Sequence, residues 1–146
     1  MKIYLIALLL CGTLTSYCQI KILRSTYSEV NSQLKVDPEV SKIATSSIVG
    51  ATKIFATLKN GYKYSFTFDA NNYKLYAMTL SCNSESETNQ KFISEKVKRR
   101  AIDIKNDGNF IFYDERNRGI YLWLSTDDFG RSLINWEAVW PFSFDL

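Results

Sequence analysis

Alternation of apolar and polar residues on both sides of an Asn-Gly pair constrains the fold of this chain more than any other feature. Asn60-Gly61 separates residues 52–59 from residues 62–69, and both turn residues tolerate the positive φ of a tight hairpin turn. In the second segment aromatic residues alternate with polar ones: Tyr62, Tyr64, Phe66 and Phe68 against Lys63, Ser65, Thr67 and Asp69. A strand with this pattern buries one face only, so the two segments are predicted to form a half-buried antiparallel hairpin.

Two helices are predicted from the residues at their starts. A Ser or Thr is followed three residues later by Glu, as in a capping box, at two places: Thr26 with Glu29, and Ser84 with Glu87. Asp37-Pro38 ends the first helix, because proline disfavours helical backbone in the residue before it. The second helix carries a narrow apolar stripe that is expected to face the sheet: Phe92, Ile93 and Val97.

Further strands are predicted at residues 73–81, 101–105, 109–114, 118–125 and 131–140, with turn residues between them. Residues 41–50 are small and polar and are interpreted as a loop or a weak strand. Apolar residues continue at the end of the sequence and are interpreted as an edge strand or a docked tail: Phe142, Phe144 and Leu146. The predicted order is α-β-β-β-α-β-β-β-β, an α+β fold with two short helices and a mostly antiparallel sheet.

Residues 1–18 have the pattern of a secretory signal peptide. Lys2 precedes an apolar run over residues 3–10, which is too short for the about 20 residues that span a bilayer. Cleavage is expected between Cys18 and Gln19, which leaves residues 19–146 as a single α+β domain that is secreted or periplasmic. A lipoprotein anchored at Cys18 is the alternative, although Tyr17 stands where such signals have a small side chain. Only in that case is a membrane an expected partner.

Several functional classes are disfavoured by composition. The chain has no histidine, which removes the commonest general base near neutral pH and the commonest metal ligand. Cys82 is the one cysteine beyond residues 1–18 and has no partner for an internal disulfide, so it is interpreted as a small buried hydrophobe rather than a reactive thiol. A net charge of +3 predicts no nucleic-acid partner. No cofactor, metal site or catalytic residue is predicted, and the chain is expected not to be an enzyme.

Carboxylates leave one catalytic alternative open. Asp114-Glu115 and Asp127-Asp128 both fall in predicted turns. A carboxylate-dependent hydrolase needs two carboxyl groups across a cleft. Turn carboxylates usually accept local backbone hydrogen bonds instead, so these four residues are interpreted as turn residues.

Aromatic residues, which make up 14% of the chain, are the candidates for binding. Four of them are considered as a flat platform for sugar rings or for a partner protein: Tyr121, Trp123, Trp136 and Trp140. Trp136 and Trp140 also share one strand face with Ile134 and Ala138, and such a stripe is typical of a core. Core and platform therefore both remain open for the tryptophans.

Three features together resemble those of a known class of proteins: the helix at residues 26–34, the order of elements, and the alternation of Tyr64, Phe66 and Phe68. In these features the chain resembles small envelope proteins of the outer-membrane assembly lipoprotein and β-lactamase-inhibitor type. No functional residue is transferred from them. We expect a secreted or cell-envelope, non-catalytic binding domain whose partner is a protein or a glycan. An inhibitor or immunity protein against an exported hydrolase is the alternative.

Overall fold

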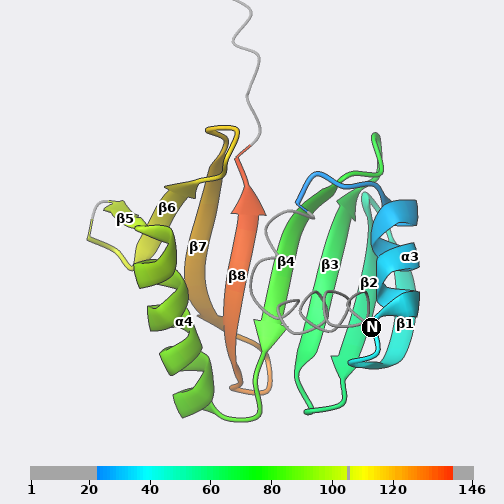
Figure 1. The fold of residues 1–146 in the computed structure, drawn as a ribbon, viewed down its shortest axis with the longest axis horizontal. Helices are drawn as coiled ribbons and strands as arrows, with labels where there is room; N and C mark the ends of the chain where they lie inside the picture. The colour runs from blue at the N-terminus through cyan, green and yellow to red at the C-terminus, as the bar shows by residue number, and fades with distance from the viewer. Residues whose placement is uncertain (1–22, 105, 140–146) are drawn as a thin grey trace, which may run out of the picture.

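A computed structural model describes residues 23–104 and 106–139 of the chain, which form two helices and one sheet of eight strands (Figure 1). All adjacent strand pairs are antiparallel, so the predicted α+β fold with an antiparallel sheet is confirmed. The elements in chain order are α3 (Tyr27–Val36), β1 (Val40–Ile48), β2 (Ala51–Leu58), β3 (Lys63–Asp69), β4 (Leu75–Ser81), α4 (Glu85–Arg99), β5 (Ile102–Ile104), β6 (Asn109–Tyr113), β7 (Gly119–Thr126) and β8 (Ser132–Ala138).

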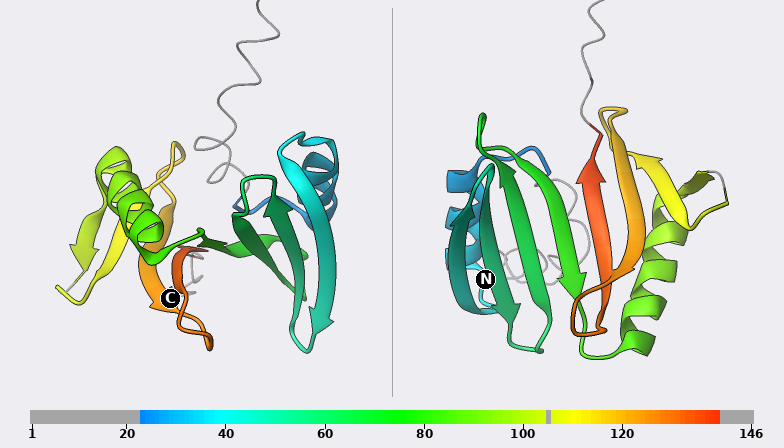
Figure 2. Two further views of the ribbon diagram at one scale, coloured as in Figure 1. Left: turned by 90° about the horizontal axis from the view of Figure 1, so that it is seen from below. Right: turned by 180° about the vertical axis from the view of Figure 1, so that it is seen from behind.

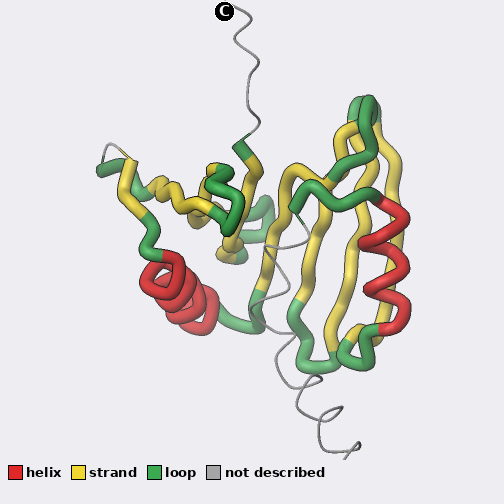
Figure 3. The backbone as a smooth tube through the Cα atoms, turned by 45° about the horizontal axis from the view of Figure 1, so that its top comes forward, coloured by secondary structure: helices red, strands yellow, loops and turns green. Residues whose placement is uncertain are grey.

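The sheet consists of two halves with the same connectivity, each a helix followed by four strands. The strand order is β1-β2-β3-β4-β8-β7-β6-β5, so the halves meet where β4 pairs with β8 and their first strands form the two edges. Turns and short loops join consecutive strands (Figure 3). Both helices lie on one face of the sheet, and the view from behind shows the sheet in front of them (Figure 2).

One element of the predicted order is wrong. Residues 40–48 form a full strand, β1, so the observed order has four strands in the first half rather than three. Ile43 pairs with Ala56, and Ser47 pairs with Thr52. Because β1 is an edge strand and most of its residues are exposed, its sequence lacks the apolar alternation that marks the half-buried strands.

The helix starts agree closely with their sequence signals. Thr26 caps α3 in a full capping box, in which the Glu29 carboxylate accepts a hydrogen bond from the Thr26 N–H at 2.7 Å. Ser84 caps α4 and accepts from the Glu87 N–H, but the Glu87 carboxylate accepts from the N–H of Asn83 instead of the cap residue. The first helix ends at Val36, before Asp37-Pro38, as predicted.

The predicted apolar stripe of α4 is wrong in two of its three residues. Phe92 is buried and packs edge-to-face on Phe110 with 5.8 Å between ring centroids, whereas Ile93 and Val97 are 58% and 75% exposed. The inward face is instead completed by two polar residues, Thr88 and Glu95. Their burial is tolerated because the Thr88 hydroxyl donates to the Ser84 carbonyl at 2.9 Å, and Glu95 is paired with Arg99.

The core lies between the helices and the facing side of the sheet. Along β2–β4 and β6–β8, alternate residues point to this side and are buried: Ile54, Ala56, Tyr64, Phe66, Phe68, Met78, Leu80, Phe110, Phe112, Ile120, Leu122, Ile134, Trp136 and Ala138. Tyr27 of α3 packs on Phe68 with 5.3 Å between ring centroids. Burial on one side and partial exposure on the other is the pattern that the aromatic alternation of residues 62–69 predicts.

Candidate functional site

The sheet has an open face, which we define as the side opposite α3 and α4. Side chains on this face alternate along each strand with the buried core residues. On β7, for example, Ile120 and Leu122 are fully buried, whereas Tyr121 is 38% exposed and Trp123 is half-buried. The open face is therefore where a partner can meet the sheet directly, because no helix of the described part of the chain covers it (Figure 2).

Strand register gathers large apolar side chains on one half of the open face. Tyr121 pairs with Ile111, and Ile111 pairs with Ile102 on the edge strand β5. We call the following residues the aromatic patch: Ile102, Ile111, Tyr113, Tyr121 and Trp123. Ile102 and Tyr113 are 61% and 54% exposed. Exposed apolar side chains gathered in this way are typical of interaction surfaces.

The other half of the open face is mostly small and polar, with two large apolar side chains, Phe55 and Ile48, that are 41% and 55% exposed. On the β4 side, Glu137 of β8 pairs with Ala77, and across β3 and β2 the same row continues through Thr67 and Lys53 to Ser46. The face therefore has a continuous apolar group on β5–β7 and a mostly polar surface on β1–β4. A surface with this division presents one orientation to a partner, because its two halves differ in chemistry.

Asn135 links the two halves at the centre of the open face. It is 9% exposed, and its amide accepts from the Thr79 hydroxyl at 3.2 Å and donates to the Ser125 hydroxyl at 2.8 Å. It also pairs directly with Trp123 across β7 and β8. This network satisfies the buried amide and holds the strand on which Trp123 lies next to β8.

The four predicted platform residues fall in different places. Tyr121 and Trp123 lie on the open face, two residues apart on β7, and are brought together as a platform requires. Trp136 is fully buried, so its assignment to a surface platform is wrong. It shares the inward side of β8 with Ile134 and Ala138, and this alternation is the physical reason for its burial. Trp140 and the apolar residues at 142–146 lie outside the described residues, as do residues 1–18 with Cys18 and the predicted cleavage position.

Sequence reasoning missed the other members of the aromatic patch. Ile102, Ile111 and Tyr113 stand on short strands that contribute to the patch only through pairing with β7. The signal available was the alternation within residues 109–113, where Phe110 and Phe112 are buried and Ile111 and Tyr113 point the other way.

Two of the four turn carboxylates, Asp114 and Asp127, accept hydrogen bonds within their own turns, as interpreted from the sequence. Asp127 Oδ1 accepts from the N–H groups of Phe129 and Arg131, both at 2.9 Å, and its Oδ2 accepts from Arg131 Nε at 2.7 Å. The hydrogen bonds from the backbone and side chain of Arg131 hold the pKa of Asp127 below its usual value. Asp114 forms the equivalent turn between β6 and β7, with Arg118 in the place of Arg131.

The environment of Cys82 does not activate its thiol. The residue is half-buried against the core, and burial raises the pKa of the thiol despite the nearby Thr88 hydroxyl and Lys91 ammonium. A raised pKa disfavours the thiolate, which is the reactive form of cysteine. Within residues 23–104 and 106–139, no three acidic or cysteine side chains are grouped as a metal site requires.

No family model, curated protein or solved structure matches this chain. None of the helices in the described ranges is long and apolar enough to cross a membrane. The described part of the chain combines two α-β-β-β-β halves in one antiparallel sheet, with helices on one face and an aromatic patch on the other.

Proposed function

We propose that this protein is an exported, non-catalytic binding module that holds a partner protein on the open face of its sheet. The observation that carries the proposal is the position of Tyr121 and Trp123, which alternate with fully buried residues on β7 and lie on the side without helices. The signal-peptide pattern of residues 1–18 supports export. The absence of histidine from the chain, and the use of the turn carboxylates as local hydrogen-bond acceptors, support a role without catalysis.

A protein partner fits this face better than a glycan. Interface centres are enriched in aromatic residues and surrounded by polar groups, and the aromatic patch borders the mostly polar surface of β1–β4 on the same face. Sugar rings stack on aromatic side chains that have polar groups beside them. Here the Asn135 amide, which is the polar group directly beside Trp123, is already hydrogen-bonded to the hydroxyl groups of Thr79 and Ser125. An inhibitor or immunity protein would bind its target in the same way, and the identity of the partner separates these roles.

Replacing Trp123 by alanine is expected to weaken partner binding by about thirtyfold, because aromatic residues at interface centres contribute about 2 kcal/mol or more. The measurement is affinity capture by the processed chain, immobilised in parallel with its Trp123→Ala variant, from the exported proteins of its source. Quantitative binding to the captured protein follows. The expected result is one stoichiometric partner that the variant fails to retain.

The control for this experiment is Phe129→Ala. Phe129 is 83% exposed in the turn between β7 and β8 and is not part of the aromatic patch. This variant is expected to retain the partner with unchanged affinity. Equal retention by wild type and Trp123→Ala, or retention of the wild type on polysaccharide with no protein partner, would contradict the proposal.

A further inference from the structure

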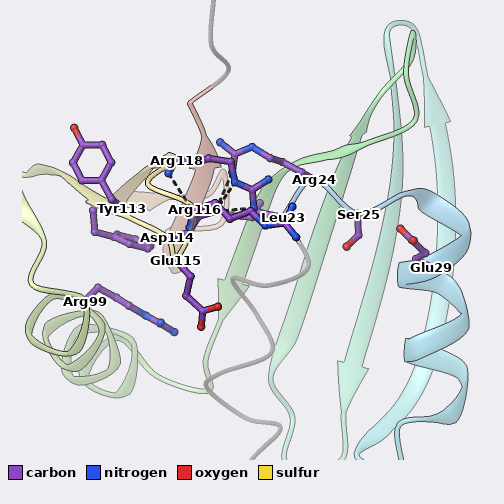
Figure 4. Close-up of a pocket in the computed structure, with 11 residues that line it drawn as sticks. Leu23, Arg24, Ser25, Glu29, Arg99, Tyr113, Asp114, Glu115, Arg116 and Arg118 are labelled. Carbon is purple, nitrogen blue, oxygen red and sulfur yellow. Dashed lines mark hydrogen bonds and ion pairs between the residues drawn. The ribbon is translucent and has the colours of Figure 1, made fainter.

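A polar pocket of about 590 Å³ lies between the segment that precedes α3, the end of α4 and the turn that joins β6 to β7, and Tyr113 of the aromatic patch also lines it. Figure 4 shows three of its arginines, Arg24, Arg116 and Arg118, gathered around Asp114. The volume falls in the range of small-molecule sites, about 300–1,000 Å³. The function proposed above does not use this pocket.

Arg24 is held in the pocket wall by an unusual local structure. Its φ is +75°, a conformation that non-glycine residues rarely adopt and that costs about 1–3 kcal/mol. Its Nη2 donates to the Val139 carbonyl at 2.9 Å and more weakly to the Gly119 carbonyl at 3.4 Å. The side chain is only 10% exposed. The fold thus accepts backbone strain to keep this guanidinium against the ends of β7 and β8.

The hydrogen-bonding capacity of Arg24 is not exhausted. Its Nη1 is buried and lies 3.8 Å from Asp114 Oδ2, which is beyond hydrogen-bond distance, and no group in the described part of the chain accepts from it. Burial, and next the charge of Arg118, lower the pKa of Arg24, which reflects a concentration of positive charge at this point.

Asp114 does not balance the positive charge around it. Its Oδ2 is shared by Arg118, at 2.8 Å, and Arg24, while its Oδ1 accepts from the N–H groups of Arg116 and Arg118. Two guanidinium groups therefore share this carboxylate, and Arg116 stands in the same turn with an exposed side chain. Of the remaining charged residues of the pocket, Arg99 pairs with Glu95 and Glu29 accepts from Thr26, while Glu115 adds a third carboxylate to the lining.

We propose that this pocket is a phosphate-binding site. The pocket is lined by four arginines and three carboxylates, and a phosphate monoester, which carries about −1.5 to −2 charges near pH 7, would offset the excess of positive charge. Arg116 is exposed and Arg118 is 37% exposed, so both can donate to phosphate oxygens, and planar guanidinium groups suit this geometry. Arg24 contributes its charge from behind Asp114. The pocket is larger than a phosphate ion needs, which favours phosphate carried by a small organic molecule.

The test is calorimetric titration of the processed chain with glucose 6-phosphate, inorganic phosphate and glucose at constant ionic strength. Saturable binding of glucose 6-phosphate is expected, with no binding of glucose. Equal affinity for inorganic phosphate would identify the free ion as the ligand, and tighter binding of glucose 6-phosphate would identify an organic phosphate. Absence of saturable binding of both phosphates would overturn the proposal.

Arg116→Gln is expected to weaken phosphate binding by about tenfold, the effect of losing one charge-assisted hydrogen bond. The side chain of Arg116 is exposed, and only its backbone N–H takes part in the turn, so the fold is preserved. The charge control is Arg131→Gln, which removes one arginine from the equivalent turn between β7 and β8, outside the pocket. An equal loss in both variants would show nonspecific attraction and reject the site.

Discussion

The Trp136→Ala variant is expected to lose about 3–5 kcal/mol of its free energy of unfolding. Trp136 is fully buried and is the largest of the buried side chains. It lies near the middle of the sheet, where β8 pairs with β4 on one side and with β7 on the other, opposite Met78 and Leu122. Its removal leaves a cavity between the two halves that neighbouring strands cannot fill without losing their hydrogen-bonded register. Urea denaturation of both proteins, followed by circular dichroism, measures the difference.

Two further variants make this prediction specific. Trp136→Phe is expected to cost much less than Trp136→Ala, because phenylalanine fills most of the space and removes an indole N–H that has no acceptor in residues 23–104 and 106–139. Trp123→Ala removes the same side chain from the opposite face and is expected to cost about 1 kcal/mol or less, since Trp123 is only half-buried. Similar losses for Trp136→Ala and Trp123→Ala would contradict the assignment of one residue to the core and the other to the surface.

Much of the fold follows from local signals in the sequence. The Asn60-Gly61 turn, the Thr26 cap and the alternation of Phe66 and Phe68 each depend on residues a few positions apart. Each is found in the structure, although of the two turn residues only Gly61 has a positive φ. Local chemistry also explains the turn at Asp127, where one carboxylate accepts from residues two and four positions later. Interactions of this range are visible in a single sequence.

Features that depend on tertiary partners were predicted less well. β1 lies at the edge of the sheet, pairs with one neighbouring strand only, and shows no alternation of apolar and polar residues. α4 buries Glu95 because Arg99 is present to pair with it. In the candidate binding face, Tyr121 and Trp123 were found from composition, but Ile102 joins them only through two strand pairings. The guanidinium cluster could not be inferred, since Arg24 and Asp114 are distant in sequence and meet only in the folded chain.

Replacement of Asp114 is expected to have the second large effect on the free energy of unfolding. Its carboxylate closes the turn between β6 and β7 and faces two guanidinium groups. Asp114→Asn retains an oxygen for the turn but removes the negative charge beside Arg24, whose side chain is only 10% exposed. Removing one partner of a buried ion pair leaves the other charge uncompensated. We expect a loss of about 2–3 kcal/mol at pH 7, measured by urea denaturation.

Asp127→Asn is the matched control for this variant. Asp127 forms the same turn, but its partner Arg131 is half-exposed, and no second guanidinium shares its carboxylate in the described structure. Its replacement is therefore expected to destabilise the protein clearly less than Asp114→Asn. If the two variants lost the same amount, turn closure alone would account for both, and the pairing with Arg24 would contribute nothing.

The pH dependence of stability tests the charge of Asp114 directly. Partial burial raises the pKa of this carboxyl, but the hydrogen bonds from Arg118 and Arg116 outweigh burial and hold the pKa below its usual value. The unfolded chain therefore takes up this proton first, at a pH near 4, while the folded chain still excludes it. The stabilisation is complete well above pH 4 and is lost as the pH falls through the lower pKa of the folded state.

The free energy of unfolding of Asp114→Asn should accordingly fall less steeply below pH 4 than that of the wild type. A slope remains from Asp127 and Glu29, whose pKa values are also lowered. Parallel slopes for the two proteins would mean that Asp114 is not held ionised by its neighbours.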